Sequence, residues 1–343
     1  MVYRYIPILR WKQGERRGLG QLQASAKSDV APLFQLAADQ YRPPRGNNPL
    51  GITPAQAFAN EVMQCWGTAP FYLDATGVPA TAGVPHPLVD LAAAARGAGL
   101  NLIPATVLGA PAAYQTAVQA VHSTDGRGAA LRVDLAEFSS AGSWAPSLPL
   151  PLGMIDLIAD FRSSIGLVSS MGAAVTAIFQ TLHSGASWRT VTIAGTSIPG
   201  DFSGYAAGLH LLPRVEWTLW GALNGASLPF RLDYGDYATV SLAAPPSGIA
   251  WGYPINVKYT LSNEFLVCRG VKTTGRGSIL MAPQLVAHAN SIVSYAGRMP
   301  IANCWADDLI DDIASGTQQP GSLETWVRIG VNRHVERVRT DLP

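Results

Sequence analysis

Eight short apolar or β-branched segments, each followed by helix-like sequence, place the tightest limit on how this 343-residue chain can fold. They recur at intervals of roughly 25 to 40 residues, as strands do when they alternate with helices. The segments are 5–9, 31–36, 71–74, 102–106, 129–135, 155–160, 190–197 and 230–236. Eight such units predict an α/β fold, a (β/α)8 TIM-like barrel, which typically takes about 250 residues. An open doubly wound sheet alternates in the same way, but the first segment is not followed by the Gly-rich dinucleotide fingerprint of that fold.

The pattern breaks after residue 240. Two strand-like segments, 255–260 and 264–269, flank Leu261-Ser262-Asn263 and predict a β-hairpin. An apolar helix is expected over 278–295, and a basic helix or strand over 325–341. No long flexible linker precedes these elements. We therefore expect residues 1–240 to form the barrel and residues 241–343 a C-terminal α/β cap, made of the hairpin and helices, that packs on the barrel and is not independent.

The composition is that of a globular protein, with 48% hydrophobic and 14% charged residues. The formal net charge of +1 excludes a global field that would recruit nucleic acid or an acidic membrane. Cys65, Cys268 and Cys304 are widely spaced and odd in number, which favours reduced thiols over a disulfide framework. No apolar run is long enough to span a bilayer, and the first residues lack a signal core. We expect a cytoplasmic protein without a membrane partner.

Polar side chains gather at the predicted C-terminal ends of the strands, where barrel enzymes place their working groups. The candidate ligand-binding residues are Lys12, Glu15, Arg132, Ser197 and, on the hairpin, Arg269. The candidate catalytic residues are Asp160, Asp236 and His334. His334 lies in a basic segment that could fold over the barrel mouth as a general acid or base. The alternative is a surface histidine on a basic helix.

Three chemistries are consistent with these residues. Lys12 and Arg132 could hold a phosphate or carboxylate, Arg through its two-pronged geometry and Lys as a point charge. Asp160 and Asp236, with Asp74, could bind Mg²⁺ through carboxylate oxygens. Two of the carboxylates could also act as an acid and base on a sugar. A structural alternative remains, in which Arg132 pairs with Asp160 or Asp134 to close a polar layer of the barrel.

Two other chemistries are disfavoured by motif spacing. The histidines show neither HxH nor HExxH spacing, which argues against a zinc site of the usual kind. Ser197 follows Gly195 and Thr196 and lacks the GxSxG elbow of a serine nucleophile, so a hydroxyl donor to ligand or a turn residue is the better interpretation.

Five segments, in this order along nearly the whole chain, resemble the phage-associated "beta protein" family. They are Tyr5-Ile-Pro-Ile-Leu-Arg-Trp-Lys-Gln-Gly-Glu15, Ile193-Ala-Gly-Thr-Ser-Ile-Pro199, Tyr234-Gly-Asp-Tyr237, Phe265-Leu-Val-Cys-Arg-Gly270 and Trp326 with Asn332-Arg-His334. The resemblance implies a role in a satellite-phage gene cassette linked to killing and exclusion of competing phages, and implies no established reaction. Arg333 stands where relatives are expected to carry another histidine, so any ligand or base role of that position is in doubt here.

Two functional hypotheses follow. In the first, the barrel mouth binds or acts on a phosphate-bearing small molecule or nucleic-acid end, as a hydrolase or lyase. In the second, the protein is a non-catalytic binding or toxin-neutralising module that contacts a protein partner encoded in the same cassette. The sequence leaves the reaction, the substrate and the need for a metal such as Mg²⁺ open.

Overall fold

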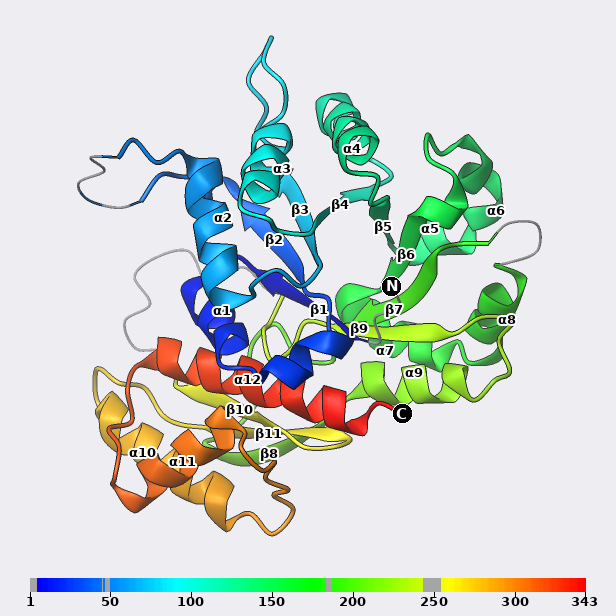
Figure 1. Ribbon diagram of the computed structural model, residues 1–343. Coiled ribbons are helices and arrows are strands. Elements are labelled where there is room, and N and C mark those ends of the chain that lie inside the picture. Colours follow the sequence, from blue (N-terminus) through cyan, green and yellow to red (C-terminus); the bar gives the residue numbers. More distant parts are fainter. Residues whose placement is uncertain (1–4, 45, 47–49, 183–186, 243–253) are drawn as a thin grey trace.

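Eight parallel strands close into a barrel in the computed structural model, which describes residues 5–44, 46, 50–182, 187–242 and 254–343 (Figure 1). The barrel is closed by the pairing of the first strand with the last, with Tyr5 opposite Tyr234. Its strands are β1 (Tyr5–Arg10), β2 (Leu33–Ala37), β3 (Phe71–Gly77), β4 (Leu102–Val107), β5 (Ala129–Val133), β6 (Ile155–Asp160), β7 (Thr190–Gly195) and β9 (Leu232–Asp236). The (β/α)8 barrel predicted from the eight apolar segments is confirmed.

Helices follow the strands and cover the outside of the barrel. They are α1 (Gln13–Gly20), α2 (Pro54–Cys65), α3 (Leu88–Gly97), α4 (Ala112–Asp125), α5 (Leu135–Ser139), α6 (Ala141–Trp144), α7 (Ile165–Ser170), α8 (Ala173–Thr181) and α9 (Val215–Asn224). Local sequence sets where they begin. The hydroxyl of Thr53, for example, accepts the Gln56 N–H at 3.2 Å, and Pro54 occupies the first helical position of α2.

The last helix of the chain, α12 (Leu323–Asp341), completes this ring of helices. It packs against α1 and β1, and Val331, Val335 and Val338 join the core between the barrel wall and the helices. Two glycines of α1 permit the close approach, since a Cβ on Gly18 would lie 3.0 Å from the Arg328 carbonyl oxygen. The segment predicted as a basic helix or strand is thus a helix of the barrel itself.

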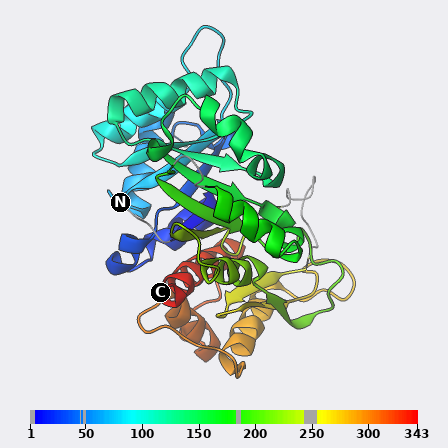
Figure 2. The same cartoon turned by 90° about the vertical axis from the view of Figure 1, so that its right-hand side faces the viewer.

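A three-stranded antiparallel sheet stands beside the barrel. The predicted hairpin supplies β10 (Asn256–Thr260) and β11 (Glu264–Arg269), and the third strand is β8 (Gly208–Pro213), from the connection between β7 and α9. Helices α10 (Met281–Ser294) and α11 (Trp305–Ser315) cover its far face. In both ribbon views α12 lies between this cap and the barrel (Figures 1 and 2). Strand β8 lies within residues 1–240 and was not predicted.

The hydrophobic core has three main clusters, and two of them meet on α12. Inside the barrel, alternate strand residues such as Ile6, Ile8 and Ile158 pack together. A larger layer fills the space between strands and helices. The cap has its own apolar cluster, and α12 contributes Trp326 and Ile329 to it. One helix therefore contributes to the core of both the barrel and the cap.

No single helix within the described ranges is long and apolar enough to cross a membrane. One bent pair, residues 162–170 with 173–181 at 107°, passes by length and composition when taken together. The three cysteines are buried and unpaired.

Candidate functional site

Three barrel strands, β3, β6 and β9, carry an aspartate at or near the C-terminal end, and each aspartate makes the same local contact. One oxygen accepts the backbone N–H two residues on, which turns the chain and fixes the carboxylate. The contacts are Thr76 N to Asp74 Oδ1 at 3.0 Å, Arg162 N to Asp160 Oδ1 at 3.2 Å and Ala238 N to Asp236 Oδ1 at 2.9 Å. The second oxygen of each carboxylate remains for longer-range partners.

Arg132 occupies the centre of the barrel at this end and is 3% exposed. Its Nη1 donates to Asp74 Oδ2, and its Nη2 donates to Asp160 Oδ2 at 2.6 Å and to the Tyr237 hydroxyl at 3.1 Å. The Tyr237 hydroxyl donates to Asp160 Oδ2 at 2.5 Å. With its amide oriented to satisfy the network, Gln35 accepts from Arg132 Nη1 at 3.0 Å.

Neighbouring charged groups determine the protonation states of Arg132 and Tyr237. Burial alone would lower the pKa of Arg132, but Asp160, Tyr237 and Asp74 raise it above its usual value, so the guanidinium stays charged. Burial and the Asp160 carboxylate raise the pKa of Tyr237, so the phenol keeps its proton and acts as a donor. The expected alternative, an Arg132 pair with Asp160, is present. Asp134 instead caps α5 by accepting the Glu137 N–H at 2.9 Å.

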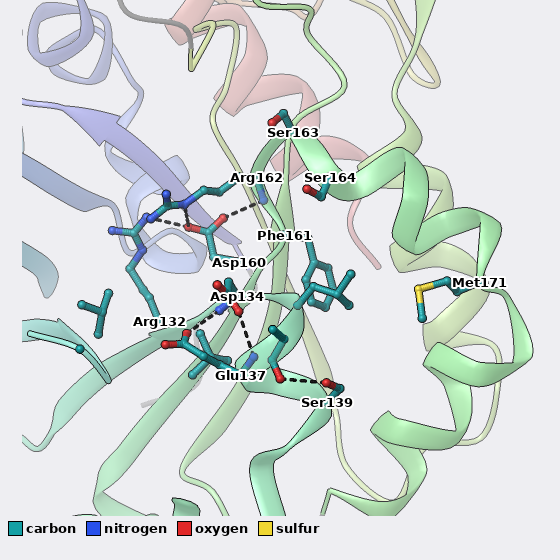
Figure 3. A pocket seen from close by; sticks show the side chains of 15 residues that line it. Arg132, Asp134, Glu137, Ser139, Asp160, Phe161, Arg162, Ser163, Ser164 and Met171 are labelled. Atoms are coloured by element: carbon teal, nitrogen blue, oxygen red, sulfur yellow. Dashed lines mark hydrogen bonds and ion pairs between the residues drawn. The ribbon is translucent and has the colours of Figure 1, made fainter.

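Two hollows open on either side of the Arg132 network at the C-terminal face. The first, which we call the β5–β6 pocket, has a volume of about 780 Å³ and is lined by Arg132, Asp160 and the loops that follow β5 and β6 (Figure 3). The second, the β1–β3 pocket, has a volume of about 500 Å³ and is lined by Arg10, Lys12 and Asp74 among others. The Arg132 network thus forms the polar floor between them.

Arg162 is the exposed cation of the β5–β6 pocket. Its side chain is 60% exposed, with Nε 3.9 Å from Asp160 Oδ2, and the guanidinium groups of Arg132 and Arg162 lie beside each other next to that carboxylate (Figure 3). Its backbone adopts the left-handed conformation, with φ of 48°. That conformation is held by the Asp160 contact and by the Thr196 N–H, which donates to the Arg162 carbonyl at 3.0 Å. A non-glycine residue held in this region is a recurrent feature of functional loops.

Asp236 and His334 come together, but they do so on the outside of the barrel wall. Strand alternation places Tyr237 inward, so the adjacent Asp236 faces α12. Asp236 Oδ2 lies 2.6 Å from His334 Nε2 and accepts the Tyr234 hydroxyl at 2.8 Å, while Oδ1 accepts the Tyr5 hydroxyl at 2.7 Å. His334 is fully buried. The expectation that it covers the mouth is wrong, and so is the surface alternative.

The protonation states in this second cluster follow from its donors. Burial would raise the pKa of Asp236, but His334, Arg214 and the Tyr5 hydrogen bond lower it to about 2. Burial lowers the pKa of His334, and Asp236 opposes that effect. A neutral His334 that donates from Nε2 to Asp236 and accepts the Thr260 hydroxyl at Nδ1, 3.0 Å away, satisfies every contact.

The other candidate residues lie apart from the Arg132 network. Lys12 is exposed in the β1–β3 pocket. Glu15 is buried and accepts the Arg10 N–H at 2.6 Å, and burial raises its pKa to about 7. Ser197 donates its N–H to Glu216 at 2.9 Å.

Arg269 lies on β11, where it donates to Asn256 at 3.2 Å. The linings of the two mouth pockets, as far as the described residues define them, include no residue of 254–343. The expected lid bearing Arg269 and His334 is therefore wrong, because the cap lies at the flank of the barrel beside α12.

The Mg²⁺ hypothesis required Asp160, Asp236 and Asp74 to converge. Arg132 lies between Asp74 and Asp160 and neutralises them, and Asp236 faces the opposite side of the wall. Within the part of the chain that the structure describes, no group of three or more His, Cys, Asp or Glu side chains is placed to hold a metal ion.

Sequence reasoning gave no site role to one main member of the mouth, Tyr237, and placed Arg162 at the end of the sixth strand without naming it a candidate ligand. Tyr237 follows the last residue of β9, and alternation from Asp233 through Gly235 would have placed it inward. The signal for Arg162 was its position at the end of the sixth strand, two residues after Asp160.

The fold and site define a class: a closed (β/α)8 barrel with a flanking α/β cap and a charged, hydrogen-bonded site at the C-terminal mouth. More narrowly, the chain belongs to the Beta protein family, whose model matches residues 5–340. No curated protein sequence matches it. A crystal structure of a candidate oxidoreductase from Bacteroides fragilis aligns over 99% of this chain and 97% of its own, at 10% identity and a TM-score of 0.16, which is too low to carry an argument.

Proposed function

We propose that the barrel mouth binds a phosphate-bearing small molecule or nucleic-acid end, and that the protein acts in a phage-associated defence or exclusion cassette. The binding proposal rests on one observation: an exposed arginine, Arg162, and a buried, charged arginine, Arg132, line the same pocket of about 780 Å³. Membership of the Beta protein family supports the cassette role.

Arginine suits this role because its planar fork meets two phosphate oxygens at once. Arg132 is oriented by Asp74 and Asp160 and cannot move without leaving buried carboxylates unpaired. Arg162 is held less tightly, because its side chain is 60% exposed and its Nε lies 3.9 Å from Asp160 Oδ2. Ser163 and Ser164 beside it line the same pocket. In the enzymatic form of the proposal, a hydrolase or lyase, Asp160, which lines the pocket, accepts a proton from the ligand or from water.

Titration calorimetry with inorganic phosphate, a nucleoside 5′-monophosphate and a short 5′-phosphorylated oligonucleotide tests the proposal. We expect at least one phosphate ligand to bind, and Arg162→Gln to weaken it by about tenfold, since a charged hydrogen bond contributes roughly 1.5 kcal/mol or more. Arg276→Gln, which removes an exposed charge from the cap, is the matched control. Absence of binding, or an equal loss of affinity in Arg162→Gln and Arg276→Gln, would overturn the proposal.

The cassette role needs a biological measurement. Cells that carry the complete cassette are challenged with phage, with wild-type protein or with Asp160→Asn. We expect the asparagine variant to lose exclusion, because it removes a charge that orients Arg132. If a folded Asp160→Asn protein still excludes phage fully, the barrel mouth is not needed for exclusion.

A second candidate function, a binding or toxin-neutralising module that acts through a protein partner, is favoured by the edge strand β8. Leu209 and Leu211 are 46% and 43% exposed on it. An open edge with apolar side chains is a surface that other chains can pair with.

Affinity capture from infected and uninfected cells tests this alternative. We expect the same cassette protein to be recovered by wild type and by Leu280→Lys, an exposed control on the cap, and to be lost with the Leu209→Lys/Leu211→Lys pair. A protein that remains alone in both kinds of cell would argue against the module.

A further inference from the structure

The lining of the β5–β6 pocket is not uniformly positive. It contains two guanidinium groups, Arg132 and Arg162, and three carboxylates, Asp134, Glu137 and Asp160. Asp160 and Asp74 share the single positive charge of Arg132, and Arg162, with Nε 3.9 Å from Asp160 Oδ2, offsets the negative charge that is left over. The groups that a ligand meets are therefore the guanidinium of Arg162 and, at the start of α5, the carboxylates of Asp134 and Glu137. A ligand that carries only negative charge would meet attraction at one wall and repulsion at the other.

The two kinds of charge lie on different walls. Arg162, Ser163 and Ser164 follow the end of β6, and Asp134 and Glu137 lie at the start of α5, which follows β5 (Figure 3). Figure 3 shows Arg162 and the serines on one side of the Asp160 carboxylate, with Asp134 and Glu137 on the other. The walls therefore present a cation with hydroxyl groups opposite a pair of carboxylates.

The acidic wall is held in place by its own hydrogen bonds. Asp134 Oδ1 accepts the Glu137 N–H at 2.9 Å, and Glu137 Oε2 accepts the Asp134 N–H at 2.9 Å. This reciprocal capping box fixes both side chains and leaves one oxygen of each without another hydrogen bond among the described residues. A preorganised acceptor pair loses little side-chain entropy on binding a donor.

A buried donor points independently to a ligand in this pocket. Arg132 lines the pocket, is 3% exposed, and its Nε has no hydrogen-bond partner within the described part of the chain. A buried N–H without an acceptor is costly, and an anionic oxygen bound beside it would remove that cost.

We infer that the β5–β6 pocket takes a zwitterionic phosphate: a phosphate monoester that also carries a cationic amino group a few bonds away. The phosphate lies at Arg162 and the ammonium group lies between Asp134 and Glu137. This inference rests on the proposed phosphate-binding function and narrows its ligand class.

Three probes test it by titration calorimetry: phosphoethanolamine, ethyl phosphate, which lacks the amino group, and ethanolamine, which lacks the phosphate. We expect phosphoethanolamine to bind at least tenfold more tightly than either of the others. Asp134→Asn/Glu137→Gln should bring phosphoethanolamine and ethyl phosphate to about equal affinity, because only the charge of the acidic wall is removed. Asparagine and glutamine preserve the capping hydrogen bonds, so the double variant is expected to fold. Asp308→Asn, an exposed change on α11, is the control that should keep the preference.

The outcomes separate this inference from the function on which it rests. Equal binding of phosphoethanolamine and ethyl phosphate by wild type, with loss in Arg162→Gln, would overturn the zwitterion and leave phosphate binding standing. A preference that survives in the Asp134→Asn/Glu137→Gln protein would also overturn it. No binding of any probe by a folded protein would overturn both.

Discussion

His334 Nε2 lies 2.6 Å from Asp236 Oδ2 in a fully buried contact that joins the last helix of the chain to the last strand of the barrel. Thr260 of the cap completes the contact at His334 Nδ1. One histidine therefore connects the barrel wall, the helix ring and the cap sheet. Because the three elements are distant in sequence, this contact forms only when all of them are in place.

Replacing Asp236 should measure the strength of that connection. Asp236→Asn keeps the shape but removes the charge that accepts from Tyr5, Tyr234 and His334. We expect a loss of about 3 kcal/mol in the free energy of unfolding, measured by urea denaturation. Asp308→Asn should change it by less than about 0.5 kcal/mol. Equal stability of the two variants would contradict a structural role for the Asp236 contact.

The stability contributed by the Arg132 network should depend on both the charge and the planar shape of the guanidinium. Arg132→Met leaves Asp74 and Asp160 buried without their cation and is expected to cost about 3 to 5 kcal/mol. Arg132→Lys keeps the charge but cannot reach both carboxylates with a planar fork, so an intermediate loss is expected. Chemical denaturation of the two variants would show this order, and a methionine variant as stable as wild type would refute it.

The packing of α1 on α12 can be tested at one glycine. A Cβ on Gly18 would meet the Arg328 carbonyl oxygen and Val331 Cβ, each at 3.0 Å, so Gly18→Ala should destabilise by about 1 to 3 kcal/mol. Gly97, near the end of α3, has no atom within 4 Å of the same position. Gly97→Ala is expected to be neutral or to stabilise by up to about 1 kcal/mol. Thermal unfolding should show a lower melting temperature for Gly18→Ala and an unchanged or higher one for Gly97→Ala, and equal losses in the two variants would contradict the close packing at Gly18.

Stability should fall as the pH rises toward neutrality because of Glu15. Burial raises its pKa from 4.5 to about 7, so the folded state prefers the protonated form. Its contribution is present below pH 4.5 and is lost as the pH rises through about 7, by up to about 3 kcal/mol. Glu15→Gln should flatten that part of the stability curve in urea titrations at pH 5 to 8. Parallel curves for the two proteins would rule this out.

Asp236 acts in the opposite direction at low pH. Its pKa is lowered from 3.8 to about 2, so the stability it contributes is present above pH 3.8 and is lost as the pH falls toward 2. The difference in free energy of unfolding between wild type and Asp236→Asn, measured by urea denaturation, should therefore shrink as the pH falls from about 4 toward 2. A difference that stays constant over this range would contradict the prediction.

Much of the barrel could be predicted because its pattern is local. Segment 155–160 reads as a strand in sequence and is β6 with the same bounds, since a run of apolar residues ending in a polar turn needs no distant partner to be recognised. The hairpin of β10 and β11 was predicted for the same reason. Strand β8 escaped because only Leu212 among its residues is buried, and it becomes a strand only by pairing with β11.

For the candidate site, too, some features were predictable from the sequence and others were not. The sequence by itself determined that Arg132, Asp160 and Asp236 stand near the ends of strands, because strand position and the aspartate turn are local properties. Only the tertiary structure decided that Asp160 faces inward to Arg132 while Asp236 faces outward to His334. The physical reason is that a strand's two faces are exchanged by a shift of one residue, and only the partners across the barrel wall determine which face lies inside.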